Sequence, residues 1–198
     1  MIISIVSYKG GVGKTTTAIH IAAVLSRKAS TLLVDGDPNE SALGWQLRGK
    51  LPFPVIVGYQ LTEYAGKFKH IILDTPARPT ADELKTICGE SSLVIVPSQP
   101  DALSLDALIK LANSFRQINA VNYKVLFTLV PPRSNAGREA KELLTELKIP
   151  FFKTEIYRRA VNGRAALKGI TSKELRDGAD AWKEFESLSR EILKYETK

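Results

Sequence analysis

Short runs of apolar, β-branched residues alternate along the chain with longer segments in which apolar residues recur every three or four positions. Nearly continuous apolar runs are typical of strands buried on both faces, and the longer spacing is typical of amphipathic helices. The alternation predicts an α/β fold with a doubly wound, mostly parallel sheet flanked by helices. We expect strands at residues 2–7, 31–34, 54–57, 70–73, 92–96, 124–130 and 151–154, and helices near 14–28, 40–48, 80–88, 101–119, 136–148, 158–167 and 178–195.

No linker, repeat or low-complexity tract divides the sequence, so residues 1–198 are expected to form a single domain. The only cysteine, Cys88, excludes an intramolecular disulfide and a cysteine-ligated metal cluster within one chain, and it fits a reducing cytoplasm. The N-terminus lacks the basic residues of a signal peptide, and no run approaches the roughly 20 apolar residues that cross a bilayer. We therefore expect a cytoplasmic protein.

A glycine-rich loop follows the first expected strand and leads into a helix. Its glycines let backbone N–H groups point at a phosphate, and the helix N-terminus adds its positive dipole end. Lys14 would contact the β- and γ-phosphates, and the Thr15 hydroxyl would bind Mg²⁺. The residues expected to bind the nucleotide in this loop are Lys9, Gly10, Gly11, Val12, Gly13, Lys14, Thr15 and Thr16.

Carboxylates follow the strands expected at residues 31–34 and 70–73. A phosphate-loop site needs such groups to hold the Mg²⁺ shell and to orient the attacking water, and the carboxyl ends of parallel strands meet at one edge of a sheet. Asp35 and Asp37 come after the first strand. Asp74 comes after the second, as a Walker B aspartate does, and would be held near Mg²⁺ through a water. A further acid, Asp101, stands where a helix N-cap is expected.

The string KGGVGKTT departs from an ordinary phosphate loop, because Tyr8 occupies the position of the first glycine and Lys9 follows it. This is the deviant Walker A box. Together with DGDPN at 35–39 and LDTPA at 73–77, it resembles the ParA/MinD family of ATPases. The resemblance implies a P-loop fold, hydrolysis of ATP with Mg²⁺, and a homodimer in which Lys9 reaches the partner subunit's phosphates.

The same resemblance assigns roles to individual residues. It makes Lys9, Lys14 and Asp37 the catalytic residues, with Asp37 organising the attacking water. The expected Mg²⁺ site comprises Thr15, Asp37 and Asp74, and Asp35 supports it. In relatives, the loop after the strand at 124–130 lies beside the adenine, which places Pro131, Pro132 and Arg133 there.

The positive charge of the chain is concentrated near its C-terminal end. The net charge is +7, and residues 153–176 hold seven basic side chains against two acidic ones. Such a cluster favours a phosphate backbone as partner, and the absence of a helix-turn-helix or zinc-finger spacing argues against base readout. The residues expected to bind DNA are Arg158, Arg159, Arg164, Lys168, Lys173 and Arg176.

The chain is similar in length to short partition ATPases of the ParF kind and to the McdA type that spaces carboxysomes. That resemblance implies non-specific binding to nucleoid DNA by the ATP-bound dimer. It also implies an adaptor of the ParB/ParG or McdB type, which stimulates hydrolysis and links the ATPase to a plasmid, a chromosome or a carboxysome.

Two alternatives stay open. A small-molecule P-loop enzyme, such as a kinase or a ligase of the dethiobiotin synthetase type, would use the same loop but would need an acceptor pocket that no motif marks. A MinD-like ATPase would bind membranes through its last helix, where Trp182, Phe185 and Leu188 share one face. The polar face of that helix mixes both charge signs, which favours packing in the core over membrane contact. His20 and His70 show no pattern of partners and are expected to be structural.

Overall fold

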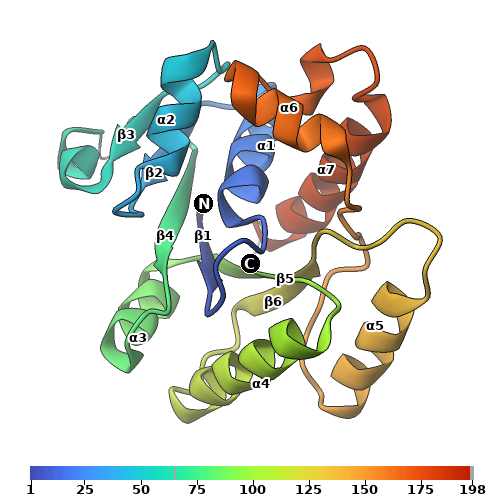
Figure 1. Ribbon diagram of the computed structural model, residues 1–198. Helices are drawn as coiled ribbons and strands as arrows, with labels where there is room; N and C mark the ends of the chain where they lie inside the picture. Colours follow the sequence, from blue (N-terminus) through green and yellow to red (C-terminus); the bar gives the residue numbers. More distant parts are fainter. Residues whose placement is uncertain (65, 197–198) are drawn as a thin grey trace.

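The computed structural model describes residues 1–64 and 66–196, which form one six-stranded sheet with helices on both faces (Figure 1). The strand order is β3-β2-β4-β1-β5-β6, and every pair of neighbours is parallel, which confirms the predicted fold class. The strands are β1 (Ile2–Ser7), β2 (Thr31–Asp35), β3 (Val55–Val57), β4 (His70–Ala77), β5 (Leu93–Ser98) and β6 (Tyr123–Phe127).

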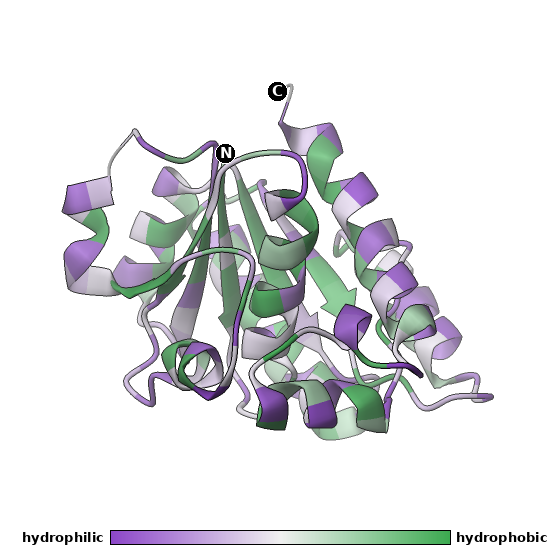
Figure 2. Cartoon of the chain, turned by 90° about the horizontal axis from the view of Figure 1, so that it is seen from above, coloured by the Kyte–Doolittle hydropathy of each residue, from purple (hydrophilic) through white to green (hydrophobic). Residues whose placement is uncertain are grey.

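Helices α1, α2, α6 and α7 cover one face of the sheet, and α3, α4 and α5 cover the other (Figure 1). Alternate residues of a strand point to opposite faces. Leu93 and Ile95 of β5 accordingly join the first apolar layer, whereas Val94 and Val96 join the second. Figure 2 shows this arrangement as hydrophobic strands between helices whose outer sides are hydrophilic. The helices are α1 (Lys14–Ser26), α2 (Ser41–Arg48), α3 (Ala81–Glu90), α4 (Ala102–Gln117), α5 (Ala136–Glu146), α6 (Ala160–Lys168) and α7 (Ala179–Ile192), and short 3₁₀ helices are η1 (Gly58–Tyr64), η2 (Ser172–Glu174) and η3 (Leu193–Tyr195).

The strand expected at 151–154 does not form, and this prediction was wrong. Within the described residues, the segment pairs with β6 in a single isolated bridge, between Val125 and Phe151. The carboxylate of Glu191 on α7 accepts hydrogen bonds from the backbone N–H groups of Lys153 (3.0 Å) and Thr154 (2.8 Å). A side chain thus takes the donors that a seventh strand would have given to the ladder.

The last helix packs into the core, as its mixed polar face predicts. Trp182, Phe185, Leu188 and Ile192 are buried against α1 and the sheet. In the described part of the chain, no helix combines the length and apolar character needed to span a bilayer.

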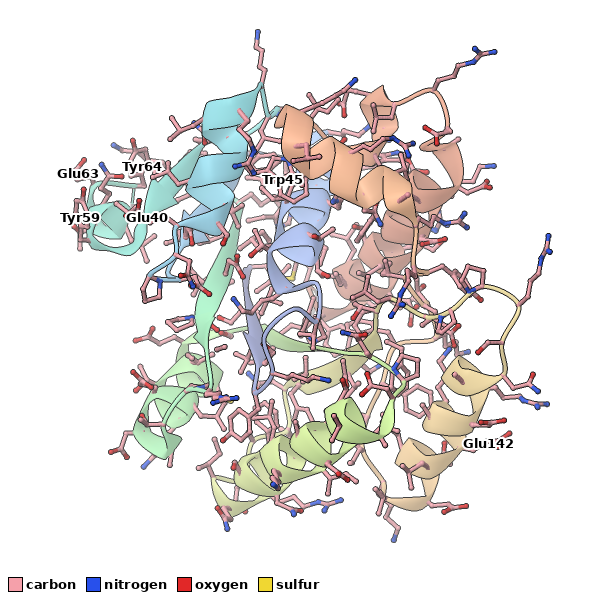
Figure 3. The ribbon with its side chains drawn as sticks, viewed as in Figure 1. Glu40, Trp45, Tyr59, Glu63, Tyr64 and Glu142 are labelled. Atoms are coloured by element: carbon pink, nitrogen blue, oxygen red, sulfur yellow. The ribbon has the colours of Figure 1, made fainter. Side chains whose placement is uncertain are left out.

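Helix α6 is held over the sheet by contacts with α2. The indole Nε1 of Trp45 donates a hydrogen bond to the carbonyl of Ile170 at 3.0 Å, and Figure 3 shows Trp45 between α2 and α6. The Arg48 guanidinium donates to the carbonyl of Ala166 at 2.9 Å. Tyr59 and Glu63, by contrast, lie on the outer side of η1, where they are exposed (Figure 3). The hydrogen bonds of Trp45 and Arg48 bring α6 to the carboxyl edge of the sheet.

His20 joins α1 to α7 and η2 in the fully buried core. Its Nδ1 donates to the carbonyl of Thr16 at 2.8 Å, its Nε2 accepts from the N–H of Ser172 at 3.1 Å, and its ring stacks on Phe185 at 4.2 Å. This pattern needs a neutral imidazole. Burial is the main cause that lowers the pKa of His20 from 6.5 to about 4.

The buried imidazole predicts a loss of stability in acid. The unfolded chain takes up a proton near pH 6.5 but the folded chain only near pH 4, so stability falls as the pH drops through this window. His20 alone should remove about 3 kcal/mol of unfolding free energy on full titration. Urea unfolding of His20→Gln between pH 7 and pH 4 should therefore show a flatter pH dependence than the wild type. The same pH series is measured for His70→Gln, because burial also lowers the pKa of His70 and this second histidine adds to the loss of stability in acid. Equal slopes in wild type and His20→Gln would contradict the assignment.

Candidate active site

A cavity of about 540 Å³ opens at the carboxyl edge of the sheet. The loop between β1 and α1 forms its floor, and the segments that follow β2 and β6, together with α6, contribute to its walls. Strand ends in doubly wound sheets are the usual place for ligands. The cavity is lined by Lys9, Gly10, Gly11, Gly13, Lys14, Thr15, Thr16, Asp37, Asn39, Thr128, Leu129, Ile156, Arg159, Asn162, Gly163 and Ala166, among others.

The glycine-rich loop has the backbone shape that its sequence predicts. Gly11 and Gly13 adopt positive φ angles of 74° and 82°, which side chains other than glycine rarely tolerate. The loop then enters α1, whose first N–H groups are free to meet an anion. Thr128 at the end of β6 fixes the loop from the side, because its hydroxyl donates to the carbonyl of Val12 at 2.7 Å.

Lys14 lies between two carboxylates at the start of α1. Its Nζ is 3.1 Å from Oδ2 of Asp37 and 3.2 Å from Oδ1 of Asp74. The Thr15 hydroxyl donates to the other oxygen of Asp74 at 2.6 Å. The structure therefore brings together four of the residues that the sequence singles out, from three different elements.

The two carboxylates have opposite pKa shifts. Burial would raise the pKa of Asp37, but the N–H of Asn39 and the Lys14 ammonium outweigh it and hold the pKa below its ordinary value. Asp74 is completely buried, and burial raises its pKa despite the opposing contacts with Lys14 and Thr15. Asp37 is thus the more readily ionised of the two and lies on the cavity wall.

The oxygen groups here suit Mg²⁺. Thr15, Asp37 and Asp74 provide hard oxygen ligands, and Mg²⁺ in nucleotide sites uses one or two such groups and completes its shell with phosphate oxygens and water. Among the described residues, no three His, Cys, Asp or Glu side chains gather as a complete protein-only metal site. This composition fits a metal that arrives with a nucleotide.

Asp35 has a different surrounding from Asp37. Its Oδ2 accepts hydrogen bonds from the N–H groups of Ala42 and Leu43, both at 2.9 Å, and its Oδ1 accepts from the N–H of Asp37 at 3.2 Å. The carboxylate therefore caps the N-terminus of α2 and shapes the loop that carries Asp37. The supporting role expected of Asp35 at the Mg²⁺ site stays a prediction.

Two residues of the cavity lining, Ile156 and Asn162, were not singled out by the sequence. They line the cavity together with Arg159, which the sequence analysis assigned to DNA binding. Pro131, Pro132 and Arg133, which the sequence placed beside the adenine, lie outside the lining, and Pro132 and Arg133 are exposed. Their contact with a base stays a prediction. No local motif marks Ile156 or Asn162. Ile156 reaches the cavity through backbone hydrogen bonds with Phe127 and Val130, and Asn162 reaches it through the packing of α6 on α2.

The basic side chains of residues 153–176, called the basic segment below, differ in whether they contact another side chain. Arg159 forms an ion pair with Glu184 at 2.8 Å and faces the cavity, and Arg164 pairs with Asp177. The Arg158 guanidinium donates to the side chain of Gln99 at 3.4 Å. The other predicted DNA-binding side chains, at Lys168, Lys173 and Arg176, are exposed.

Comparison with known proteins matches the geometry. A model of the CobQ/CobB/MinD/ParA nucleotide-binding domain covers residues 3–172. The chain belongs to this family. It is 32% identical over 182 residues to the maintenance of carboxysome distribution protein A of Gloeobacter kilaueensis, which covers 86% of this chain and 82% of that protein.

Solved structures share the fold at lower identity. A putative plasmid partition protein from Borrelia burgdorferi, bound to AMPPNP, is 22% identical, with a TM-score of 0.75 and 98% of both chains covered. MinD from Pyrococcus horikoshii, complexed with Mg-ADP, is 20% identical, with a TM-score of 0.72 over 96% of this chain and 95% of that one. The chain therefore has the fold of a MinD/ParA-type nucleotide-binding domain along its whole described length.

Proposed function

We propose that this protein is an ATP-dependent dimerisation switch that binds DNA non-specifically and positions or segregates a cargo. The observation that carries the proposal is that Lys9 lines the same cavity as Lys14 and Asp37, with Asp74 buried behind Lys14 and in contact with it. The Lys9 side chain is 35% exposed, so a second nucleotide-loaded subunit can reach it. The other three groups serve the nucleotide of their own subunit.

Each residue of the site then has a defined task. The loop from Gly10 to Thr16 binds the phosphates through its N–H groups, and Lys14 moves from the carboxylates to the β- and γ-phosphates. Thr15 and Asp74 would hold Mg²⁺, which would supply positive charge beside the transferred phosphoryl group. Asp37 orients the attacking water and supports the metal shell. The ionised state that its lowered pKa favours suits this task.

Lys9 converts nucleotide binding into dimerisation. Its ammonium would reach the phosphates of the partner subunit, so that ATP stabilises the homodimer through a charge-assisted contact that the monomer lacks. Hydrolysis removes the γ-phosphate and with it part of this contact. An adaptor of the ParB/ParG or McdB type would stimulate hydrolysis and carry the plasmid, chromosome or carboxysome. The names of the carboxysome and plasmid relatives support both kinds of cargo.

The exposed members of the basic segment form the proposed DNA surface. Lys168 and Arg176 are exposed on α6 and after η2. Three further side chains are assigned to the same surface, each with one contact there. Arg158 contacts Gln99, Arg164 pairs with Asp177, and Lys173 lies over the ring of Trp182. Arg159 is the weakest candidate, because its ion pair with Glu184 and its place in the cavity wall tie it to the nucleotide site. This surface would hold the ATP-bound dimer on the nucleoid.

The test is binding of random-sequence duplex DNA with ATP, ADP or no nucleotide over a series of salt concentrations. Binding is expected only with ATP and should weaken steeply with salt, because neutralised phosphates release counterions. Lys168→Glu should lower the affinity about tenfold at physiological salt and leave ATP binding unchanged. Lys85→Glu, at an exposed position on α3, is the control for the same charge reversal. DNA binding by Lys168→Glu equal to the control would exclude this surface.

A further inference from the structure

A second cavity, of about 390 Å³, lies at the amino edge of the sheet, opposite the nucleotide cavity. The end of α1, the start of β4 and the C-terminal part of α7 line it, and Val24, Leu25 and Leu193 give it an apolar side. Among the described residues, the two cavities share no lining residue. Helix α1, about 20 Å long, begins at the nucleotide cavity and ends at this one. The volume is typical of a small-molecule site.

The lining of this amino-edge cavity is rich in positive charge. Its basic side chains are Arg27, Lys28, Lys69 and Arg190. Two of them are paired with the carboxylates of the lining, because Arg27 contacts Glu186 at 2.7 Å and Lys69 contacts Glu196 at 3.0 Å. In the part of the chain that the structure describes, Lys28 and Arg190 form no ion pair. Four cations against two carboxylates leave an excess of two positive charges.

Two buried polar atoms beside the cavity lack a hydrogen-bond partner within the described residues. They are Nδ1 of His70 and Oγ of Ser189, whose residues line the cavity and are 2% and 1% exposed. Burial lowers the pKa of His70, so the ring is neutral at pH 7 and has one N–H group to donate. Its Nε2 lies 4.0 Å from Oε1 of Glu196, too far for a hydrogen bond. Buried polar groups without partners cost free energy, which an oxygen-rich ligand would recover.

We infer that this cavity binds a small organic molecule that carries a phosphate group. The charge favours phosphate over carboxylate, because a phosphate monoester has roughly 1.5 to 2 negative charges at pH 7 and thus matches the excess in the lining. Lys28 and Arg190 would bind its oxygens, the arginine through its planar fork. His70 and Ser189 supply further donors, and the apolar side of the lining accommodates the organic part. The inference is independent of the proposed switch, because the site lies outside the nucleotide cavity.

The test is an NMR titration of nitrogen-15-labelled protein loaded with one equivalent of Mg-ADP, so that the nucleotide cavity is occupied. The probes are inorganic phosphate and phenyl phosphate, and the comparison compounds are phenol and benzoate, which lack the phosphate. The ring nitrogens of His70 report on the amino-edge cavity, and His70→Gln assigns their signals. Phenyl phosphate should shift these signals to saturation and bind at least about tenfold more tightly than benzoate.

The two cations without a carboxylate should account for the affinity. Lys28→Ala and Arg190→Ala should each weaken the binding of phenyl phosphate about tenfold, because each removes a charged hydrogen-bond donor. Both side chains are exposed, so the melting temperature should stay unchanged. Lys85→Ala and Arg138→Ala, at exposed positions outside the cavity, are the matched controls and should bind as the wild type does.

Four results would overturn the inference. The first is the lack of a saturating His70 shift with both inorganic phosphate and phenyl phosphate. The second is equal affinity for phenol and phenyl phosphate, and the third is unchanged affinity in both Lys28→Ala and Arg190→Ala. The fourth comes from a short DNA duplex added at equal phosphate concentration: if it displaces phenyl phosphate, the cavity belongs to a DNA-binding surface and not to a small molecule.

Discussion

Lys14→Ala is expected to lower the affinity for ATP and ADP by about a hundredfold or more. The Lys14 ammonium is the cation at the floor of the cavity, and truncation of one member of a buried charge pair typically costs 2–5 kcal/mol, or about 30- to several-thousand-fold. Every step that follows nucleotide binding should fail with it. Isothermal titration with ADP, followed by ATP-dependent DNA binding, measures both effects.

The same substitution should also destabilise the fold. Lys14 contacts the fully buried carboxylate of Asp74, and removing the partner of a buried charge costs about 3 kcal/mol. Thermal melting must therefore accompany the binding assay. Lys14→Arg is the second variant, because it keeps the positive charge beside Asp37 and Asp74 but replaces the compact ammonium with a planar fork. ATP-dependent DNA binding by a folded Lys14→Ala protein would contradict the assignment of the site.

Asp37→Ala is expected to bind ATP and to accumulate as an ATP-bound dimer, with hydrolysis at least about a hundredfold slower. Positioned acid–base groups contribute roughly 10²–10⁴ to such reactions. ATP binding should persist, because the phosphate loop and Asp74 are unchanged and α2 is capped by Asp35 rather than by Asp37. Single-turnover hydrolysis and size-exclusion chromatography with light scattering measure the two effects.

The control variant removes an aspartate that lies outside the nucleotide site. Asp106→Ala, at an exposed position on α4, should hydrolyse ATP at the wild-type rate. An Asp37→Ala protein that is loaded with ATP and stays monomeric would contradict the hydrolytic role. That result would indicate that Asp37 supports the dimer instead.

Asp35, the last residue of β2, and Asp37, two positions later, show how far a motif can be interpreted alone. Asp35 and Asp37 are two positions apart, and both could face a phosphate from a strand end. In the structure, Asp35 is buried and accepts from the first N–H groups of α2, whereas Asp37 reaches Lys14 and the cavity wall. Strand geometry accounts for neither choice, because both depend on where α2 lies. Tertiary contacts separated a capping residue from a site residue.

Residues 151–154 show a local pattern that led to a wrong prediction. The apolar run at 151–154 has strand character, and its position after a helix suggests a seventh strand. Glu191, about forty positions later, binds the backbone donors of Lys153 and Thr154. A local pattern contains no information about a competing acceptor so far away in the chain.

The sequence by itself determined the parallel α/β architecture, the phosphate loop, and the acidic residues at two strand ends. These features depend on short-range patterns: apolar runs, glycine spacing, and a lysine and threonine that begin a helix. Only the tertiary structure decided that Ile156 and Asn162 line the cavity, which arginines are paired, and that Lys9 contacts Asp101 and Ser104. Ile156 is placed by its backbone bonds beside β6, and Asn162 and Asp101 by the packing of α6 and α4. The physical reason is that such contacts join residues far apart in the chain, and their energies depend on distances that no local spacing encodes.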